Sequence, residues 1–184
     1  MITKHYADTN GVYLGNFYVG DQPADAVEVT GPPDRYEQRW LGDHWSDPII
    51  QPIEVDQERD RRAALGFVYA GKTYQSGNQS QVDDILGKMS DSLAAITIDG
   101  AQPGDLRWAT PDFDFAWSAA DGTLVPMDAQ TCLEFTRSAV RRKTMLVAAG
   151  LALKAKSPIP IDFTNDKYWP PMDATVRTQA KSSK

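Results

Sequence analysis

The sequence predicts an α+β protein: small antiparallel strands and hairpins packed with two main helices, preceded by an extended β-rich N-terminal arm. Two stretches, near residues 80–96 and 129–154, repeat apolar residues at the spacing of a helix face. Between and before them lie short aromatic and β-branched runs, separated by turn dipeptides such as NG at 10–11 and DG at 121–122. Helices and local hairpins of this kind indicate α+β architecture.

The same observations predict how the chain divides. Residues 54–156 hold both amphipathic helices and most of the strand pairs, so this part should fold alone. The first 53 residues contain few elements that could build a separate core, which predicts an attachment module that gains stability from a partner or from the rest of the chain. Residues 157–184 are broken by prolines and read as a C-terminal arm and tail.

Strand and turn signals run through the N-terminal arm. The run "VYLGNFYV" after the NG turn is aromatic and β-branched, as in a strand, and "DAVEV" reads as a second short strand before the prolines at 32–33. Trp40 and Trp45 stand on either side of a Gly-Asp pair, which predicts a small hairpin with aromatic residues near its turn.

The middle of the chain reads as helix, hairpin and helix. "IEVDQERDRRAAL" is rich in helix formers and Gly66 provides a stop. "FVYAGKTYQ" predicts a hairpin that turns at Ala70-Gly71, and the polar loop "YQSGNQS" is interpreted as a connector to the next helix. Ser80, followed by Asp83, matches a capping box. The apolar residues at helical spacing after this cap are Val82, Ile85, Leu86, Met89 and Leu93.

Three strand-like pieces, "LRWAT", "FDFAWSA" and "TLVPM", precede the long helix. In the second piece Phe113, Phe115 and Trp117 alternate with smaller or polar residues, the pattern of a half-buried strand. Asp128 is expected to cap a helix from Ala129 to Lys154. The expected buried face of this helix consists of Cys132, Phe135, Ala139, Leu146 and Ala149.

Composition and charge exclude several classes of protein. The 184 residues carry a net charge of −6, so binding to nucleic acid would require a local basic patch. Cys132 is the single cysteine, which rules out an internal disulfide framework. The N-terminus lacks the apolar stretch of a signal peptide, and the longest apolar run is far shorter than a membrane span. We therefore expect a protein that is made and folded in a cytoplasm.

Candidate catalytic groups are few. "GDHWSD" places Asp43, His44 and Asp47 in one loop, where a metal site or an acid–base group is conceivable. A polar turn is the simpler interpretation. Asp112 and Asp114 are expected to face solvent opposite the aromatic residues. Cys132 has no base nearby in the sequence and is expected to be buried. The sequence thus predicts no catalytic residue, no metal and no cofactor.

Residues from about Arg59 to Lys154 resemble an uncharacterised domain found in phage and prophage tail-fibre-associated proteins. The resemblance rests on "RDRRAALGFVYAGKTYQSGNQS", a helix starting near "QSQVDDI", then "RWATPDF…DGTLVPMDAQTCLEF" and the helix through "RRKTMLVAAGLALKA". An aspartate is usual in the polar loop of that family, about where Gly77 stands here. The stretch "GVYLGNFYVGDQPADAVEVTGPPDRYEQRWLGDHW" is also similar to the openings of tail-fibre and fibre-assembly proteins.

The resemblance implies a structural protein of a bacteriophage tail, at the tail tip or fibre base, that acts through protein–protein contacts in the virion after synthesis in the bacterial cytoplasm. The first alternative is a tail-fibre assembly chaperone. A sugar-binding module or a small enzyme is the less favoured alternative. The expected partners are other phage tail or fibre proteins, with a homo-oligomer left open and with neither nucleic acid nor membrane involved. The candidate interface residues are the aromatics Tyr13, Phe17, Trp40, Trp45, Tyr168 and Trp169.

Overall fold

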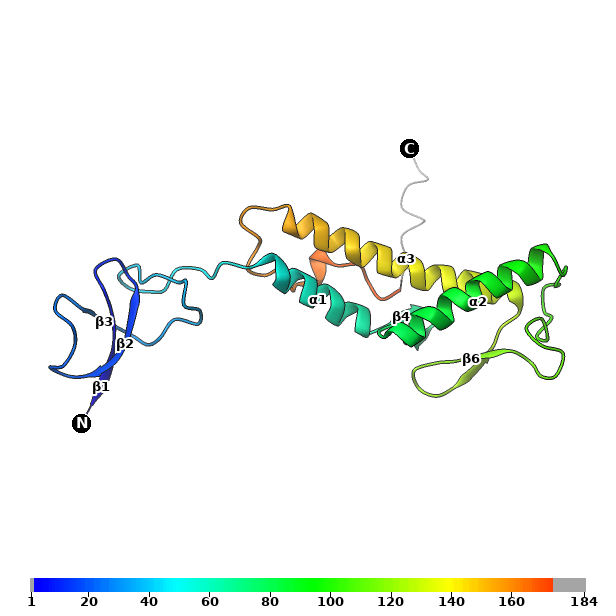
Figure 1. Cartoon of the computed structure of the whole chain (residues 1–184), viewed down its shortest axis with the longest axis horizontal. Coiled ribbons are helices and arrows are strands. Elements are labelled where there is room, and N and C mark those ends of the chain that lie inside the picture. Colours follow the sequence, from blue (N-terminus) through cyan, green and yellow to red (C-terminus); the bar gives the residue numbers. More distant parts are fainter. Residues whose placement is uncertain (1, 174–184) are drawn as a thin grey trace. The chain divides into compact units, whose positions relative to one another are not determined.

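A computed structural model describes residues 2–173, which form two compact units (Figure 1). Unit 1 contains residues 2–51 and 156–162, and unit 2 contains residues 52–155 and 163–173. The division expected after residue 53 lies in the first turn of helix α1 (Pro52–Ala64). The expected C-terminal arm is shared between the two units up to residue 173, and the rest of it lies outside the described residues. The fold is α+β, as predicted.

Unit 1 is built on a three-stranded antiparallel sheet in the order β2-β1-β3. The strands are β1 (Thr3–Ala7), β2 (Tyr13–Tyr18) and β3 (Val27–Val29). β1 pairs with both neighbours, so that Lys4 lies opposite Phe17 and His5 opposite Val29. The predicted strands before and after the NG turn are thus confirmed, and the predicted hairpin around Trp40 and Trp45 is present as an isolated antiparallel bridge.

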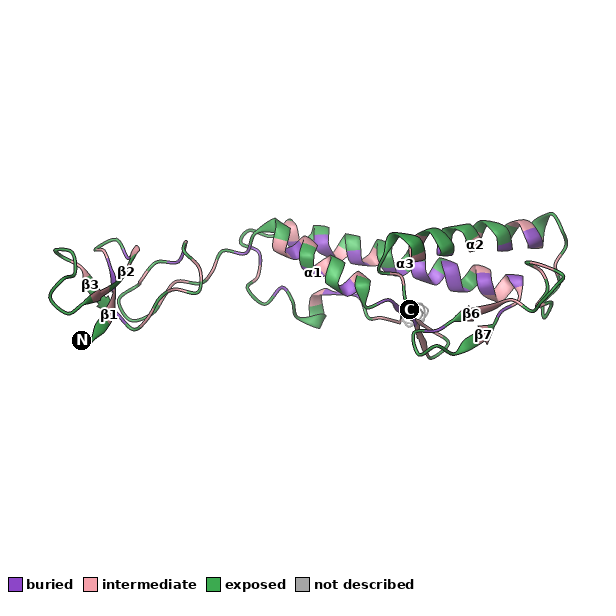
Figure 2. Ribbon diagram, turned by 60° about the horizontal axis from the view of Figure 1, so that its bottom comes forward, coloured by how far each residue is buried: buried purple, intermediate pink, exposed green. Residues whose placement is uncertain are grey.

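Unit 2 is organised around the long helix α3 (Ala129–Lys154), which packs against α1, against α2 (Gln79–Thr97) and against strand β4 (Phe67–Tyr69). The predicted cap is confirmed, because the Asp128 carboxylate accepts a hydrogen bond of 2.8 Å from the Thr131 N–H. Figure 2 shows the buried stripe that runs along α3. Of the residues expected on this stripe, Cys132, Phe135, Ala139 and Leu146 are buried, whereas Ala149 is half-buried.

Two hairpins complete the core of unit 2. β4 pairs with β5 (Lys72–Tyr74), and β6 (Ala116–Ser118) pairs with β7 (Leu124–Pro126). Both residues of the Ala70-Gly71 turn have positive φ, as the predicted tight turn requires. The hairpins bring aromatic side chains onto α3. The ring centres of Phe67, Tyr74 and Trp117 lie 4.7–5.1 Å from that of Phe135.

Gly66 ends α1 as the sequence predicts. Its N–H donates to the Ala63 carbonyl at 3.0 Å, and its φ of 80° lies in the left-handed region that favours glycine. A Cβ atom at this position would come 2.0 Å from the carbonyl oxygen of Tyr74. The residue is therefore required both by the turn and by the close approach of β5 to the end of the helix.

Several local predictions are wrong. "LRWAT" forms turns and bends instead of a strand, and the expected strand from Phe113 is reduced to β6. Phe113 is 63 % exposed, whereas Phe115 and Trp117 pack against the core, so the alternation holds only next to the hairpin. Leu86 and Leu93 belong to the apolar residues at helical spacing in α2, yet both are exposed, and the buried residues of this helix are Ile85, Ser92 and Ala95.

The cap of α2 is also shifted from the prediction. Asn78 is the N-cap residue, and its side chain accepts a hydrogen bond from the Gln81 N–H, while the Gln81 side chain accepts one from the Asn78 N–H. Ser80 lies inside the first turn instead. Asn78 with Gln81, like Ser80 with Asp83, is a polar pair three residues apart. The structure uses the first pair, so the capping box begins two residues earlier than the sequence alone suggested.

The last described residues complete unit 2. The Val68 N–H donates to the Met172 carbonyl at 3.0 Å, and Asp173 forms an isolated parallel bridge with Val68, so the chain runs beside β4. A short 3₁₀ helix, η1 (Asp166–Tyr168), precedes this segment. Among the helices of residues 2–173, none has the length and apolar character needed to cross a lipid bilayer.

Candidate functional site

Three of the aromatic residues singled out by the sequence lie together in unit 1. Tyr13, Trp40 and Trp45 form what we call the aromatic cluster: the Trp45 ring centre lies 5.3 Å from that of Trp40 and 6.0 Å from that of Tyr13. Backbone and side-chain hydrogen bonds hold the cluster in place. The Trp40 N–H donates to the Gly11 carbonyl at 2.9 Å, and Trp45 Nε1 donates to the Gly31 carbonyl at 3.1 Å.

Each ring of the aromatic cluster is half-buried. The Tyr13 hydroxyl also forms a hydrogen bond of 2.6 Å with His5 Nδ1. Trp40 Nε1 is buried and has no hydrogen-bond partner among the described residues. A buried indole N–H without a partner is uncommon, because desolvating a donor without compensation costs free energy. Within unit 1 the rings of the cluster are therefore only partly covered, and one of its hydrogen-bond donors, Trp40 Nε1, has no acceptor among the described residues.

Phe17 belongs to β2 and packs edge-on against Tyr6, with 6.2 Å between ring centres. Exposure alternates along β2, so Tyr13 and Phe17 are half-buried while Leu14 and Tyr18 are exposed. Tyr13 and Phe17, the candidates predicted from the sequence, are the inner residues of this strand, whereas Leu14 and Tyr18 on its outer side were not among them. The period of two along "YLGNFY" is the signal that could have identified them.

The other two aromatic candidates belong to unit 2. Trp169 is buried, with 4 % of its surface exposed, and its Nε1 donates to the Phe163 carbonyl at 2.7 Å. The Arg62 guanidinium lies 5.3 Å from the centre of its ring. Tyr168 is half-buried, with Lys167 Nζ 4.8 Å from its ring centre. In this conformation Trp169 is a core residue of unit 2, and Tyr168 retains an exposed edge.

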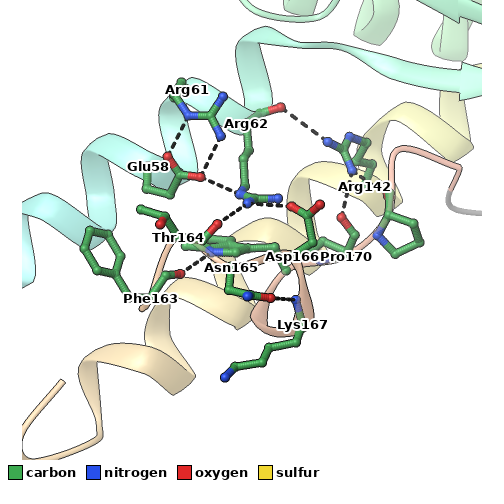
Figure 3. A network of polar contacts seen from close by, with 12 residues as sticks. Glu58, Arg61, Arg62, Arg142, Phe163, Thr164, Asn165, Asp166, Lys167 and Pro170 are labelled. Carbon is green, nitrogen blue, oxygen red and sulfur yellow. Dashed lines mark hydrogen bonds and ion pairs between the residues drawn. The ribbon is translucent and has the colours of Figure 1, made fainter. Parts of the chain in front are cut away.

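A network of arginines fastens the C-terminal segment to the helices (Figure 3). Arg62 donates to Glu58 at 2.6 Å and to the Thr164 carbonyl at 2.7 Å, and it forms an ion pair of 2.8 Å with Asp166. Arg61 donates two further hydrogen bonds to Glu58. The hydrogen bonds from Arg61 and Arg62 outweigh burial and lower the pKa of the Glu58 carboxyl, so this carboxylate is ionised at neutral pH.

Arg142 extends the network from α3. Its side chain is buried and donates to the carbonyls of Gly66, Pro170, Pro171 and Arg62 at distances from 2.5 to 3.3 Å. Burial lowers the pKa of this guanidinium from its ordinary value, but an arginine remains charged across the physiological range. The network satisfies backbone carbonyls of the C-terminal segment and of α1, so its evident role is to hold the segment in place.

The candidate catalytic groups are not brought together. The His44 side chain forms a hydrogen bond with Asp43 in an exposed loop, and Asp114 pairs with Arg107 on the surface. Cys132 is buried, and burial raises the pKa of its thiol to about 12, so it is an unreactive thiol at neutral pH. Within residues 2–173, no three acidic, cysteine or histidine side chains are grouped in a way that could hold a metal ion.

The polar loop before α2 is a connector, as the sequence predicts, but it also borders a groove. The groove encloses about 330 Å³ and is lined by residues 76–79 of the loop together with side chains of α1, α2 and α3. Gly77 occupies the place where the resemblance leads us to expect an aspartate. A Cβ atom there would lie 2.8 Å from the Ala64 Cα, so close packing against the end of α1 favours glycine.

Comparison with known proteins identifies one family. Residues 51–169 match the family model described as "Domain of unknown function (DUF4376)". No curated protein and no solved structure matches the chain. The matched range covers more than half of the chain and contains α1, α2, α3 and both hairpins of unit 2. The protein therefore belongs to the DUF4376 family.

Proposed function

We propose that the protein is a structural component of a bacteriophage tail, at the tail tip or fibre base, which acts through protein–protein contacts. The resemblance of both parts of the sequence to tail-fibre-associated proteins supports the tail assignment. The mode of action is supported by unit 1, which exposes more large apolar side chains than it buries. Within residues 2–51 the buried apolar side chains are Tyr6, Ala7, Val29 and Ile50.

The exposed apolar residues of unit 1 carry the proposal. Leu14, Tyr18 and Val19 lie on or next to β2, an edge strand of the sheet, and Tyr36 and Leu41 are exposed in the loops. Exposed apolar groups concentrated on a small unit are typical of protein–protein contact sites. An edge strand adds unpaired backbone groups that can accept a strand from a partner. Unit 1 is therefore suited to attachment to another protein, and the packing of the aromatic cluster stabilises its loops.

Mass spectrometry of phage particles purified from cells that make the protein tests the tail assignment. A tail component should be present in the particles in a fixed ratio to a known tail protein. If the protein copurifies with fibres but is missing from finished particles, it is an assembly chaperone and the structural assignment is wrong. If it accompanies neither particles nor fibres, the tail assignment itself is wrong.

A variant of the exposed side of β2 tests the contact site. Leu14→Ser combined with Tyr18→Ser should prevent incorporation into particles, because both side chains are exposed and their loss leaves the packing of unit 1 unchanged. Asn16→Ser, on the same exposed side between them, is the matched control and should be incorporated normally. Normal incorporation of the double variant would show that β2 is not the contact site.

A further inference from the structure

A second hollow lies between α2 and the β6–β7 hairpin. It encloses about 430 Å³, within the range of about 300–1,000 Å³ that is typical of ligand sites. Gln81 and Asp84 line it from α2, Trp117 and Ser118 line it from the hairpin, and Gln75 lines it from the segment that follows β5. All of these residues belong to unit 2. We call this hollow the polar pocket.

Trp117 gives the polar pocket an aromatic surface that is held in place. Pairing of Trp117 with Val125 across the hairpin fixes its backbone, and its ring packs on Phe135 of the core with 4.7 Å between ring centres. The ring is only half-buried, and Trp117 lines the pocket. A tryptophan fixed in this way offers a large apolar contact area, and a ligand that packs on it has little side-chain motion to restrict.

Hydrogen-bonding groups without partners surround this ring. The exposed Asp84 carboxylate has no partner among the described residues. The Gln81 side chain is already occupied, because its oxygen accepts from two backbone N–H groups of the capping box and its Nε2 donates to Gln75 Oε1 at 2.8 Å. The bond from Gln81 orients Gln75, whose Nε2 has no partner within residues 2–173. The polar pocket therefore offers a charged acceptor at Asp84 and an amide donor at Gln75.

The combination of donor, acceptor and aromatic ring decides which class of ligand fits. Neighbouring hydroxyl groups of a sugar donate and accept hydrogen bonds at short spacing, and the C–H side of a pyranose ring packs on an aromatic side chain. A cation would use Asp84 and the ring but would leave the donor at Gln75 unpaired. An anion would be repelled by Asp84. The lining thus favours a neutral, hydroxyl-rich ring.

We infer that the polar pocket binds a neutral saccharide. One sugar ring lies on Trp117, and its hydroxyl groups donate to Asp84 and accept from Gln75. This inference goes beyond the proposed function and does not depend on it. The proposed contacts in a phage tail are made by unit 1 and are tested on particles, whereas the polar pocket belongs to unit 2 and is tested on the purified chain, so either can fail alone.

NMR titration of the full, ¹⁵N-labelled chain with glucose, galactose, mannose and N-acetylglucosamine tests the inference. The indole N–H signal of Trp117 is the reporter, and comparison with Trp117→Phe identifies it among the five tryptophans. At least one of the four sugars should shift this signal, with a Kd on the order of 1 mM for a single ring in an open pocket. Choline, a cation of the kind that aromatic rings bind, should leave the signal unshifted.

Two neighbouring aspartates of α2 provide a matched pair of variants. Asp84→Ala should weaken sugar binding by about tenfold or more, because the hydroxyl groups lose a charged acceptor. Asp83→Ala makes the same change of charge one residue earlier, outside the lining, and should change the Kd by less than about twofold. Both aspartates are exposed, so far-UV circular dichroism should show unchanged helix content.

Three results would overturn the inference. The first is that none of the four sugars shifts the Trp117 signal at concentrations well above the expected Kd. The second is that Asp83→Ala and Asp84→Ala weaken sugar binding equally, which would place the site elsewhere or make the effect one of overall charge. The third is that choline shifts the signal and the sugars do not, which would make the polar pocket a cation site.

Discussion

Replacing Trp169 with alanine should destabilise unit 2 strongly, although sequence analysis places this residue in an interface. Its ring is 4 % exposed and its indole N–H donates to the Phe163 carbonyl at 2.7 Å. Truncation of a buried tryptophan costs about 3–5 kcal/mol, and the loss of its hydrogen bond is part of that cost. The neighbouring Tyr168 is half-buried, so Tyr168→Ala should cost about 1 kcal/mol or less.

Urea denaturation followed by far-UV circular dichroism measures both values, because the α-helices of the described residues all lie in unit 2. Trp169→Phe separates the two contributions: it keeps most of the ring, removes the N–H donor and should cost about 1–2 kcal/mol. The reasoning is refuted if Trp169→Ala and Tyr168→Ala lower the free energy of unfolding by the same amount to within about 0.5 kcal/mol. That result would mean that the C-terminal segment does not pack on α1 and α3 in solution.

Two further predictions concern the helix cap and the arginine network. Asn78→Ala should lower the free energy of unfolding by about 1 kcal/mol, because the capping box loses its acceptor, whereas Ser80→Ala should change it by less than about 0.5 kcal/mol. The same denaturation measures both, and equal costs would contradict the assigned cap. Because the pKa of Glu58 is lowered below its ordinary 4.5, its stabilising contribution is complete above about pH 4.5 and is lost as the pH falls through the lower folded-state value. Stability measured from pH 7 to pH 3 should therefore fall less steeply in Glu58→Gln than in the unaltered protein, and parallel curves would contradict this.

Local signals in the sequence determined most of the elements. The extent of α3 and its Asp128 cap, the stop at Gly66 and the turn at Ala70-Gly71 each depend on residues within a few positions of one another. Capping and positive-φ turns are set by short-range sterics and hydrogen bonds, so a single sequence is enough to locate them. The cap of α2 is the exception, because the sequence predicts it at Ser80 whereas the structure has it at Asn78.

Contacts between distant residues were decided only by the tertiary structure. The sequence identifies Trp169 and Tyr13 as large aromatic residues but does not show that one is buried and the other half-exposed, since burial depends on segments far away along the chain. Arg142 stands in the basic run RRK at 141–143, yet it is buried and donates to the carbonyl of Gly66, 76 residues away. Likewise, Leu86 has the helical spacing of the other apolar residues of α2, yet it is 43 % exposed. Periodicity states which side chains share a face of a helix, and only packing determines whether that face is covered.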